Sequence, residues 1–130
     1  MNMHMVSLEP PRNFESPLHA QGVLVSPPGG LAFVSGQVGV GPDATTGNGV
    51  EEQTRIAFDN IARILAEAGL GLRHLASVRI YLTSRDHIET FTRVASDCLR
   101  GHRPTATLLL VEHLAKPTLL VQVEAVAISG

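Results

Sequence analysis

The C-terminal stretch, from Pro104 to the end of the chain, constrains the fold most. Residues 105–111 and 118–128 are two runs of aliphatic and β-branched side chains, a composition typical of buried strands. Pro104 precedes the first run, and Lys116 and Pro117 separate it from the second. We therefore expect two C-terminal strands in a domain that contains a sheet.

One charged residue, Glu124, interrupts the second run. In an extended chain its side chain shares a face with Gln122 and Val126. A carboxylate on such a face lies at the rim of a cleft or at a subunit boundary, where it suits proton transfer or the holding of a water. The alternative is a glutamate on an edge strand that merely faces solvent, and the local pattern alone favours this alternative.

Length and composition limit the classes of protein that this chain can form. The 130 residues suffice for a single domain, residues 1–130. Only 4% of the residues are aromatic, so the core must consist of aliphatic side chains. The net charge of −2 disfavours a nucleic-acid partner, because no basic surplus is present to displace counterions from phosphates.

The single cysteine and the N-terminus indicate the cellular setting. Cys98 has no second cysteine to pair with, which fits a reduced compartment, and its helical spacing from Phe91 and Ala95 indicates a place in the core. The N-terminus lacks the charged and then apolar pattern of a signal peptide. No apolar run approaches the ~20 residues of a membrane span. We expect a soluble, cytoplasmic protein with no membrane partner.

Apolar periodicity predicts the order of the remaining elements. Residues 27–30 have the composition of a tight hairpin between two strands, and Asp86, with Glu89 three residues later, is a candidate helix cap. The predicted elements before Pro104 are strands at 5–8, 21–25, 31–37 and 75–83, a helix at 50–68, and a second helix from about 86 to 100.

The order β-β-β-α-β-α-β-β indicates an α+β fold, a mostly antiparallel or mixed sheet with two helices packed on one face. Two helices cover only one side of such a sheet, and the aliphatic strands leave an apolar face on the other side. An uncovered apolar face of that size predicts association between copies of the chain.

Ser35 and Gly36 lie inside the predicted strand at 31–37. A glycine within a strand is unfavourable unless a backbone or a ligand approaches closely, or unless the strand simply bulges there. Together the two residues can present a hydroxyl and an open main chain to a ligand.

The remaining polar residues give weaker signals. The six histidines form no metal-ligand pattern, and no nucleophile lies at a motif-like spacing from a base, so we expect no metal and no cofactor. His19 is either an ordinary loop residue or the border of a cleft. Arg79 either points into solvent from the open face of a sheet or binds an anion.

Several segments together resemble one family. They are FVSGQ at residues 33–37, the helix at 51–69, the strand VRIYLT, RPTAT, and VQVEAVAI near the C-terminus. The combination is similar to the Rid (YjgF-type) family of reactive-intermediate imine deaminases, and the likeness runs from about residue 17 to residue 128. It implies a chorismate-mutase-like fold and a homotrimer with three clefts between subunits.

The resemblance also implies site residues. Ser35, Gly36 and Glu124 match the family. The family's arginine, which grips the substrate carboxylate, follows a proline by two residues, and the corresponding residue here is Ala106. The family's tyrosine in its G-P-Y-S segment corresponds to Leu18, with His19 next.

Two functions follow from the likeness. In the first, a small enamine or imine resembling 2-iminopropanoate is hydrolysed to a carbonyl compound and ammonia. Backbone N–H groups around Gly36 and Thr107 bind it, and Glu124 orients a water and transfers a proton. In the second, the trimer binds a small metabolite without turnover, because Ala106 cannot bind the substrate carboxylate as the family's arginine does. Arg103 or Arg79 could replace that arginine.

A third idea, ribonuclease activity, comes from the family's older label. The acidic balance of the chain and the absence of a catalytic histidine pair argue against it.

Overall fold

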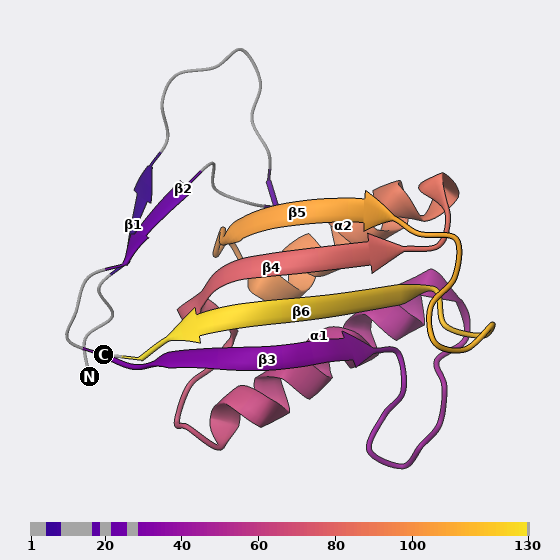
Figure 1. Ribbon diagram of the computed structural model, residues 1–130, viewed down its shortest axis with the longest axis horizontal. Coiled ribbons are helices and arrows are strands. Elements are labelled where there is room, and N and C mark those ends of the chain that lie inside the picture. Colours follow the sequence, from indigo (N-terminus) through magenta and orange to yellow (C-terminus); the bar gives the residue numbers. More distant parts are fainter. Residues whose placement is uncertain (1–4, 9–16, 19–21, 26–28, 130) are drawn as a thin grey trace.

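The computed structural model describes residues 5–8, 17–18, 22–25 and 29–129. Its main feature is a four-stranded sheet with two α-helices on one face (Figure 1). One pair of neighbouring strands in this sheet is parallel, and the other two pairings are antiparallel. The α+β architecture with a mixed sheet is therefore confirmed. In spatial order the strands are β3 (Leu31–Val38), β6 (Val121–Ile128), β4 (Leu75–Leu82) and β5 (Thr105–Leu110), and the helices are α1 (Gly49–Ala66) and α2 (Ile88–Leu99).

Alternation along the strands separates a covered face from an open face. In β6, Val121, Val123 and Ala125 are buried under the helices, whereas the residues between them are only partly buried. The helices contribute the two largest fully buried side chains, Phe58 and Phe91, whose ring centroids lie 6.4 Å apart. Gln122, Glu124 and Val126 therefore project from the face that the helices leave open.

The last strand of the chain lies in the interior of the sheet. β6 pairs with β3 on one side and with β4 on the other, and the two C-terminal strands are not neighbours. Glu124 is therefore not on an edge strand, and that sequence-based interpretation is wrong. The sequence pattern could not reveal this because it gives a strand's faces and not its position in the sheet.

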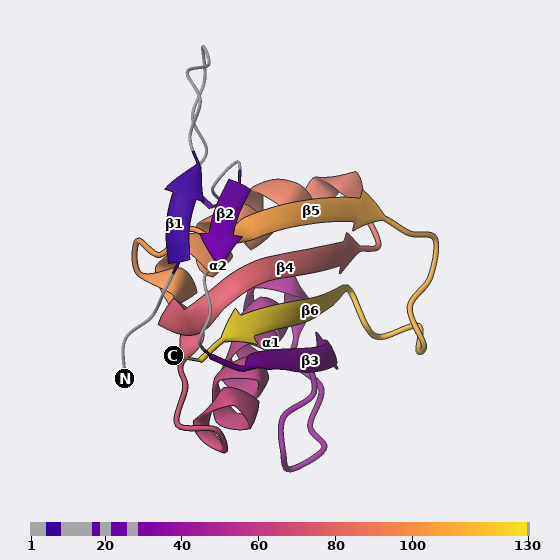
Figure 2. The ribbon, with the colours of Figure 1, turned by 60° about the vertical axis from the view of Figure 1, so that its left-hand side comes forward.

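Two further strands, β1 (Met5–Leu8) and β2 (Gly22–Val25), pair with each other in a separate antiparallel sheet (Figure 2). The expected hairpin between residues 21–25 and 31–37 is therefore wrong, since β3 pairs with β6 instead. Turn residues such as those at 27–30 indicate a reversal of the chain, but they do not decide which strand becomes the partner.

The second helix begins differently from our expectation. The Ser84 side chain accepts a hydrogen bond from the backbone N–H of Asp86 at 3.1 Å and caps a short 3₁₀ turn, Arg85–His87, which leads into α2. Asp86 is therefore not the cap. Both residues are of the type that caps helices, and the intervening turn shifts that role to Ser84.

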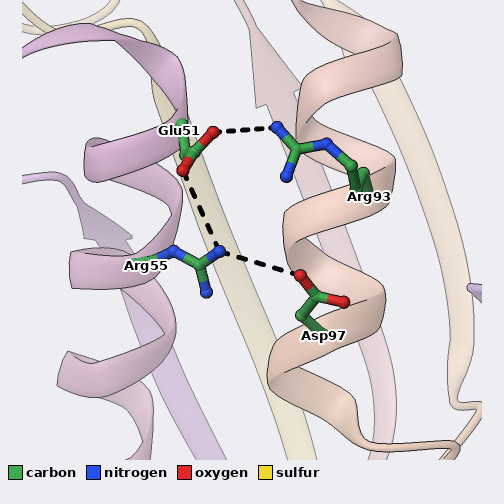
Figure 3. A network of polar contacts seen from close by, with 4 residues as sticks. All are labelled: Glu51, Arg55, Arg93 and Asp97. Carbon is green, nitrogen blue, oxygen red and sulfur yellow. Dashed lines mark hydrogen bonds and ion pairs between the residues drawn. The ribbon is translucent and has the colours of Figure 1, made fainter.

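A network of charged side chains connects the outer surfaces of α1 and α2 (Figure 3). Arg93 donates to Glu51 at 2.8 Å, and this hydrogen bond lowers the pKa of the Glu51 carboxyl. Arg55 lies 4.0 Å from Glu51 and 3.7 Å from Asp97. All four side chains are well exposed, so the network contributes little to the stability of the helix pair.

Cys98 lies at the margin of the core, half-buried and packed against it, and burial raises the pKa of its thiol. Within the described ranges, no helix is both long enough and apolar enough to cross a bilayer.

Candidate functional site

A pocket of about 310 Å³ opens on the uncovered face of the sheet, over β3, β6 and β4. Glu124 and Arg79 are its charged residues, and Ser35 and Ser77 contribute hydroxyls. The remaining lining is apolar and consists of Phe33, Val34, Ala125 and Val126.

A bulge in β3 forms one wall of this pocket. Val34 pairs with Ala125 and Gln37 pairs with Val123, so that Ser35 and Gly36 together oppose the single residue Glu124. Both bulge residues are exposed. The bulge therefore places the Ser35 hydroxyl and the main chain of two residues across from Glu124, with the Gln122 side chain lying against Gly36.

The carboxylate of Glu124 is held from the neighbouring strand. The Tyr81 hydroxyl donates to Oε1 of Glu124 at 2.6 Å, and Nη1 of Arg79 lies 4.0 Å from the same oxygen. Arg79 is directly opposite Glu124 in the β4–β6 register, and Tyr81 lies two residues further along β4 on the same face. The hydrogen bond to Glu124 is the main cause that raises the pKa of Tyr81, and burial adds to it.

The other residues that the sequence singled out lie in several places. Thr107 is beside Arg79 in the parallel β4–β5 register and is exposed on the open face. Ala106 pairs with Val78 and packs against the core, on the side that the helices cover. Leu18 is buried in the core cluster. Arg103 is partly buried and precedes β5. His19 lies outside the described residues.

Tyr81 is the site residue that sequence reasoning did not select. The alternation along the strand does place Tyr81 on the same face as Arg79, which was a partial signal. The bond to Glu124 depends on β6 lying directly beside β4, and that adjacency joins residues 43 positions apart in the sequence.

A larger hollow, of about 670 Å³, lies on the helix side between α1 and α2. Cys98, Arg55 and Asp97 are among the residues that line it, and Arg55 and Asp97 lie within ion-pair distance of each other. The smaller pocket is the better candidate because it combines a carboxylate, a guanidinium and two hydroxyls, and because the Tyr81 phenol beside it binds the carboxylate.

The chemistry available in the smaller pocket is acid–base chemistry together with anion binding. Glu124 can accept a proton, and the guanidinium of Arg79 can bind a carboxylate. Among the described residues, no three side chains of the histidine, cysteine, aspartate and glutamate types gather closely enough to hold a metal ion.

Comparison with known proteins shows which family this chain resembles. The family model described as Endoribonuclease L-PSP matches residues 19–129. The mitochondrial protein mmf2 of Schizosaccharomyces pombe is 35% identical over 61% of this chain, and the chain spans 63% of that protein's length. TdcF of Escherichia coli, a protein named as a reactive intermediate deaminase, is 28% identical over 77% of this chain and 80% of its own.

The fold is also that of solved structures. YyfB of Yersinia pestis, a Rid family protein of unknown function, superposes with a TM-score of 0.85 over 96% of this chain and 98% of its own. Its sequence identity is 22%, so this likeness concerns the fold alone.

Proposed function

Because the chain belongs to the Rid family, whose Endoribonuclease L-PSP model matches residues 19–129, we propose that it hydrolyses small enamines and imines to carbonyl compounds and ammonia. The observation that carries this proposal is the placement of Glu124 in a pocket, beside a guanidinium and across from an open bulge. A reactive carbon seated over the bulge would lie between these groups.

The proposed reaction is general-base catalysis of water addition. Glu124 takes a proton from a water as the water oxygen bonds to the imine carbon, the C=N electron pair moves to nitrogen, and the protonated Glu124 returns that proton to the nitrogen. Glu124 then takes the hydroxyl proton of the carbinolamine and passes it to the amino nitrogen, so that the C=O bond forms as the C–N bond breaks and ammonia leaves. For an enamine, protonation of the terminal carbon forms the imine first.

Substrate recognition differs from the family pattern, because Ala106 cannot bind a carboxylate. We assign that role to Arg79, which lies on the same face as Glu124, whereas Ala106 faces the covered side of the sheet. The Arg79 side chain is 58% exposed and lies 4.0 Å from Glu124, so most of its N–H donors stay open to a ligand. Substrates with a small carboxylate would fit this arrangement.

The proposed assembly is a homotrimer with the open sheet faces at its centre. Support comes from large apolar side chains on that face, with Phe33 75% exposed, Leu31 56% and Leu109 44%. A second subunit covering this face would enclose the pocket and exclude water from it.

The decisive assay is ammonia release from imines generated in situ by an amino-acid oxidase or a pyridoxal-phosphate enzyme. Wild-type protein should accelerate release, Glu124→Gln should abolish the acceleration, and Glu112→Gln should retain it. Glu112 is a matched control because it is an exposed glutamate outside the pocket. Equal rates for wild type and Glu124→Gln would contradict the proposal.

A second candidate function is ligand binding without turnover, and the observation that favours it is alanine at position 106. Thermal-shift measurements with small carboxylates separate the two functions. A ligand that stabilises the protein and is recovered unchanged supports binding alone.

A further inference from the structure

The two oxygens of the Glu124 carboxylate have different surroundings. Oε1 accepts the hydrogen bond from Tyr81 and lies near the guanidinium of Arg79. No hydrogen bond from the described residues reaches Oε2. A proton taken from a water would therefore go to Oε2, because Oε1 already gives one lone pair to the Tyr81 hydrogen bond and lies near the positive charge of Arg79, and both make it the less basic oxygen.

The hydrogen bond from the Tyr81 hydroxyl to Glu124 is short. Its 2.6 Å length is in the range of an O–H donor bound to an ionised carboxylate, and such bonds are stronger than neutral ones. Both residues are on interior strands, β4 and β6, and their backbones are fixed by hydrogen bonding on both sides. A rigid donor of this kind fixes the orientation of the carboxylate.

The surroundings of Tyr81 keep its hydroxyl protonated. Its neighbours in the register are Leu109 on β5 and Gln122 on β6, which carry no charge, and the charged groups that face it are Arg79 and Glu124. The hydrogen bond to Glu124 and burial raise the pKa of Tyr81 above the ordinary tyrosine value. The phenol thus remains a hydrogen-bond donor at neutral pH.

We propose that Tyr81 is a positioning residue that binds Oε1 of Glu124 and thereby leaves Oε2 as the oxygen that activates water. The catalytic part of this inference rests on the proposed function, but the Tyr81–Glu124 bond does not.

The composition of the chain makes the bond directly measurable. Tyr81 is the only tyrosine and the chain has no tryptophan, so near-ultraviolet absorbance follows the ionisation of this phenol alone. The wild-type phenol should ionise above the ordinary tyrosine value. Glu124→Gln should lower that midpoint toward the ordinary value, and Glu112→Gln should leave it unchanged, with circular dichroism at each pH verifying that the protein is folded.

Fluorescence at neutral pH gives a second readout that avoids alkaline conditions. A carboxylate bound to a phenol quenches its emission, so Glu124→Gln should brighten the single tyrosine. An unchanged midpoint together with unchanged emission in Glu124→Gln would overturn the Tyr81–Glu124 bond, and with it the positioning role.

Kinetics test the positioning role itself. Tyr81→Phe should lower kcat about tenfold with little change in KM, because the lost bond orients the base and does not bind substrate. In the double variant Tyr81→Phe/Glu124→Gln, kcat should be no lower than in Glu124→Gln alone. A Tyr81→Phe protein with the kcat of the wild type would overturn the positioning role. If the wild-type protein itself releases no ammonia, the proposed function is wrong, and the optical measurements still test the Tyr81–Glu124 bond.

Discussion

Gly36 lies so close to the side chain of Gln122 that no Cβ fits between them. A methyl group built on Gly36 would be 2.8 Å from Cδ of Gln122 and 3.0 Å from its Cγ. Gln122 projects from β6 onto the open face, two residues before Glu124, so the close contact is at the border of the candidate site. The glycine in the bulge is thus explained by the approach of a neighbouring side chain.

Substitution of Gly36 by alanine should therefore destabilise the protein moderately. The new methyl group displaces the flexible end of Gln122 and not a backbone atom, so we expect a loss of about 1–2 kcal/mol in the free energy of unfolding. In a Gln122→Ala background the same substitution should cost much less, because the methyl group then has space. Urea denaturation of the wild type, the two single variants and the double variant measures this difference. An equal loss of unfolding free energy on Gly36→Ala in both backgrounds would show that the contact with Gln122 does not matter.

A buried amide, Gln53, should be critical for stability. Its Nε2 donates to the carbonyls of Gly47 and Thr118 at 3.1 and 2.9 Å, and its Oε1 accepts from the N–H of Leu120 at 2.9 Å. Gln53→Leu leaves all three backbone groups without this partner, and we expect a loss of about 3 kcal/mol or more. Glu52→Leu, at the exposed position next to it, is the control and should change the unfolding midpoint little. Similar midpoints for the two variants would contradict the prediction.

His74 should make stability depend on pH. The residue is buried, its Nδ1 accepts the N–H of Gly71 at 3.0 Å, and burial lowers the pKa of its imidazole. Because the unfolded chain then binds a proton at higher pH than the folded protein, stability falls as pH drops through the ordinary histidine value. The fall levels off below the folded pKa.

The variant His74→Asn keeps an acceptor near Gly71 but cannot titrate. Unfolding free energies at about pH 7.5 and about pH 5 should therefore differ more for the wild type than for His74→Asn. The same pH dependence in both proteins would rule out a contribution from His74.

Phe33 should control association. We expect the wild type to sediment as a trimer, and Phe33→Lys should shift the population toward monomers by placing a charge on the apolar open face. Ile64→Lys is the control, because Ile64 is an exposed apolar residue on helix α1, on the other side of the sheet. If Phe33→Lys sediments like the wild type, the open face of the sheet is not the subunit interface.

Local patterns in the sequence predicted most of the secondary structure. Alternation of apolar residues identified the strands around Arg79 and Glu124, and a three- to four-residue apolar period identified both helices. These signals succeed because burial of one face of an element leaves a periodic trace in its own residues.

Pairing between distant segments could not be predicted in this way. The expected partner of β3 was β2, and the actual partner is β6, about 90 residues away. The same reason applies to Tyr81, whose contact with Glu124 requires a particular neighbour strand and register. Gln53 appears in the sequence as an ordinary polar residue of a helix, although it is buried and bonded to two separate loops.

The interior position of β6 has a consequence for how the protein is made. During translation, β3 and β4 leave the ribosome long before β6, and the gap between them stays open until the final residues emerge. Between the synthesis of β4 and that of β6, the nascent chain must hold two unpaired strand edges apart. Premature termination between the end of β4 and residue 121 would release a polypeptide whose half-built sheet is prone to aggregation.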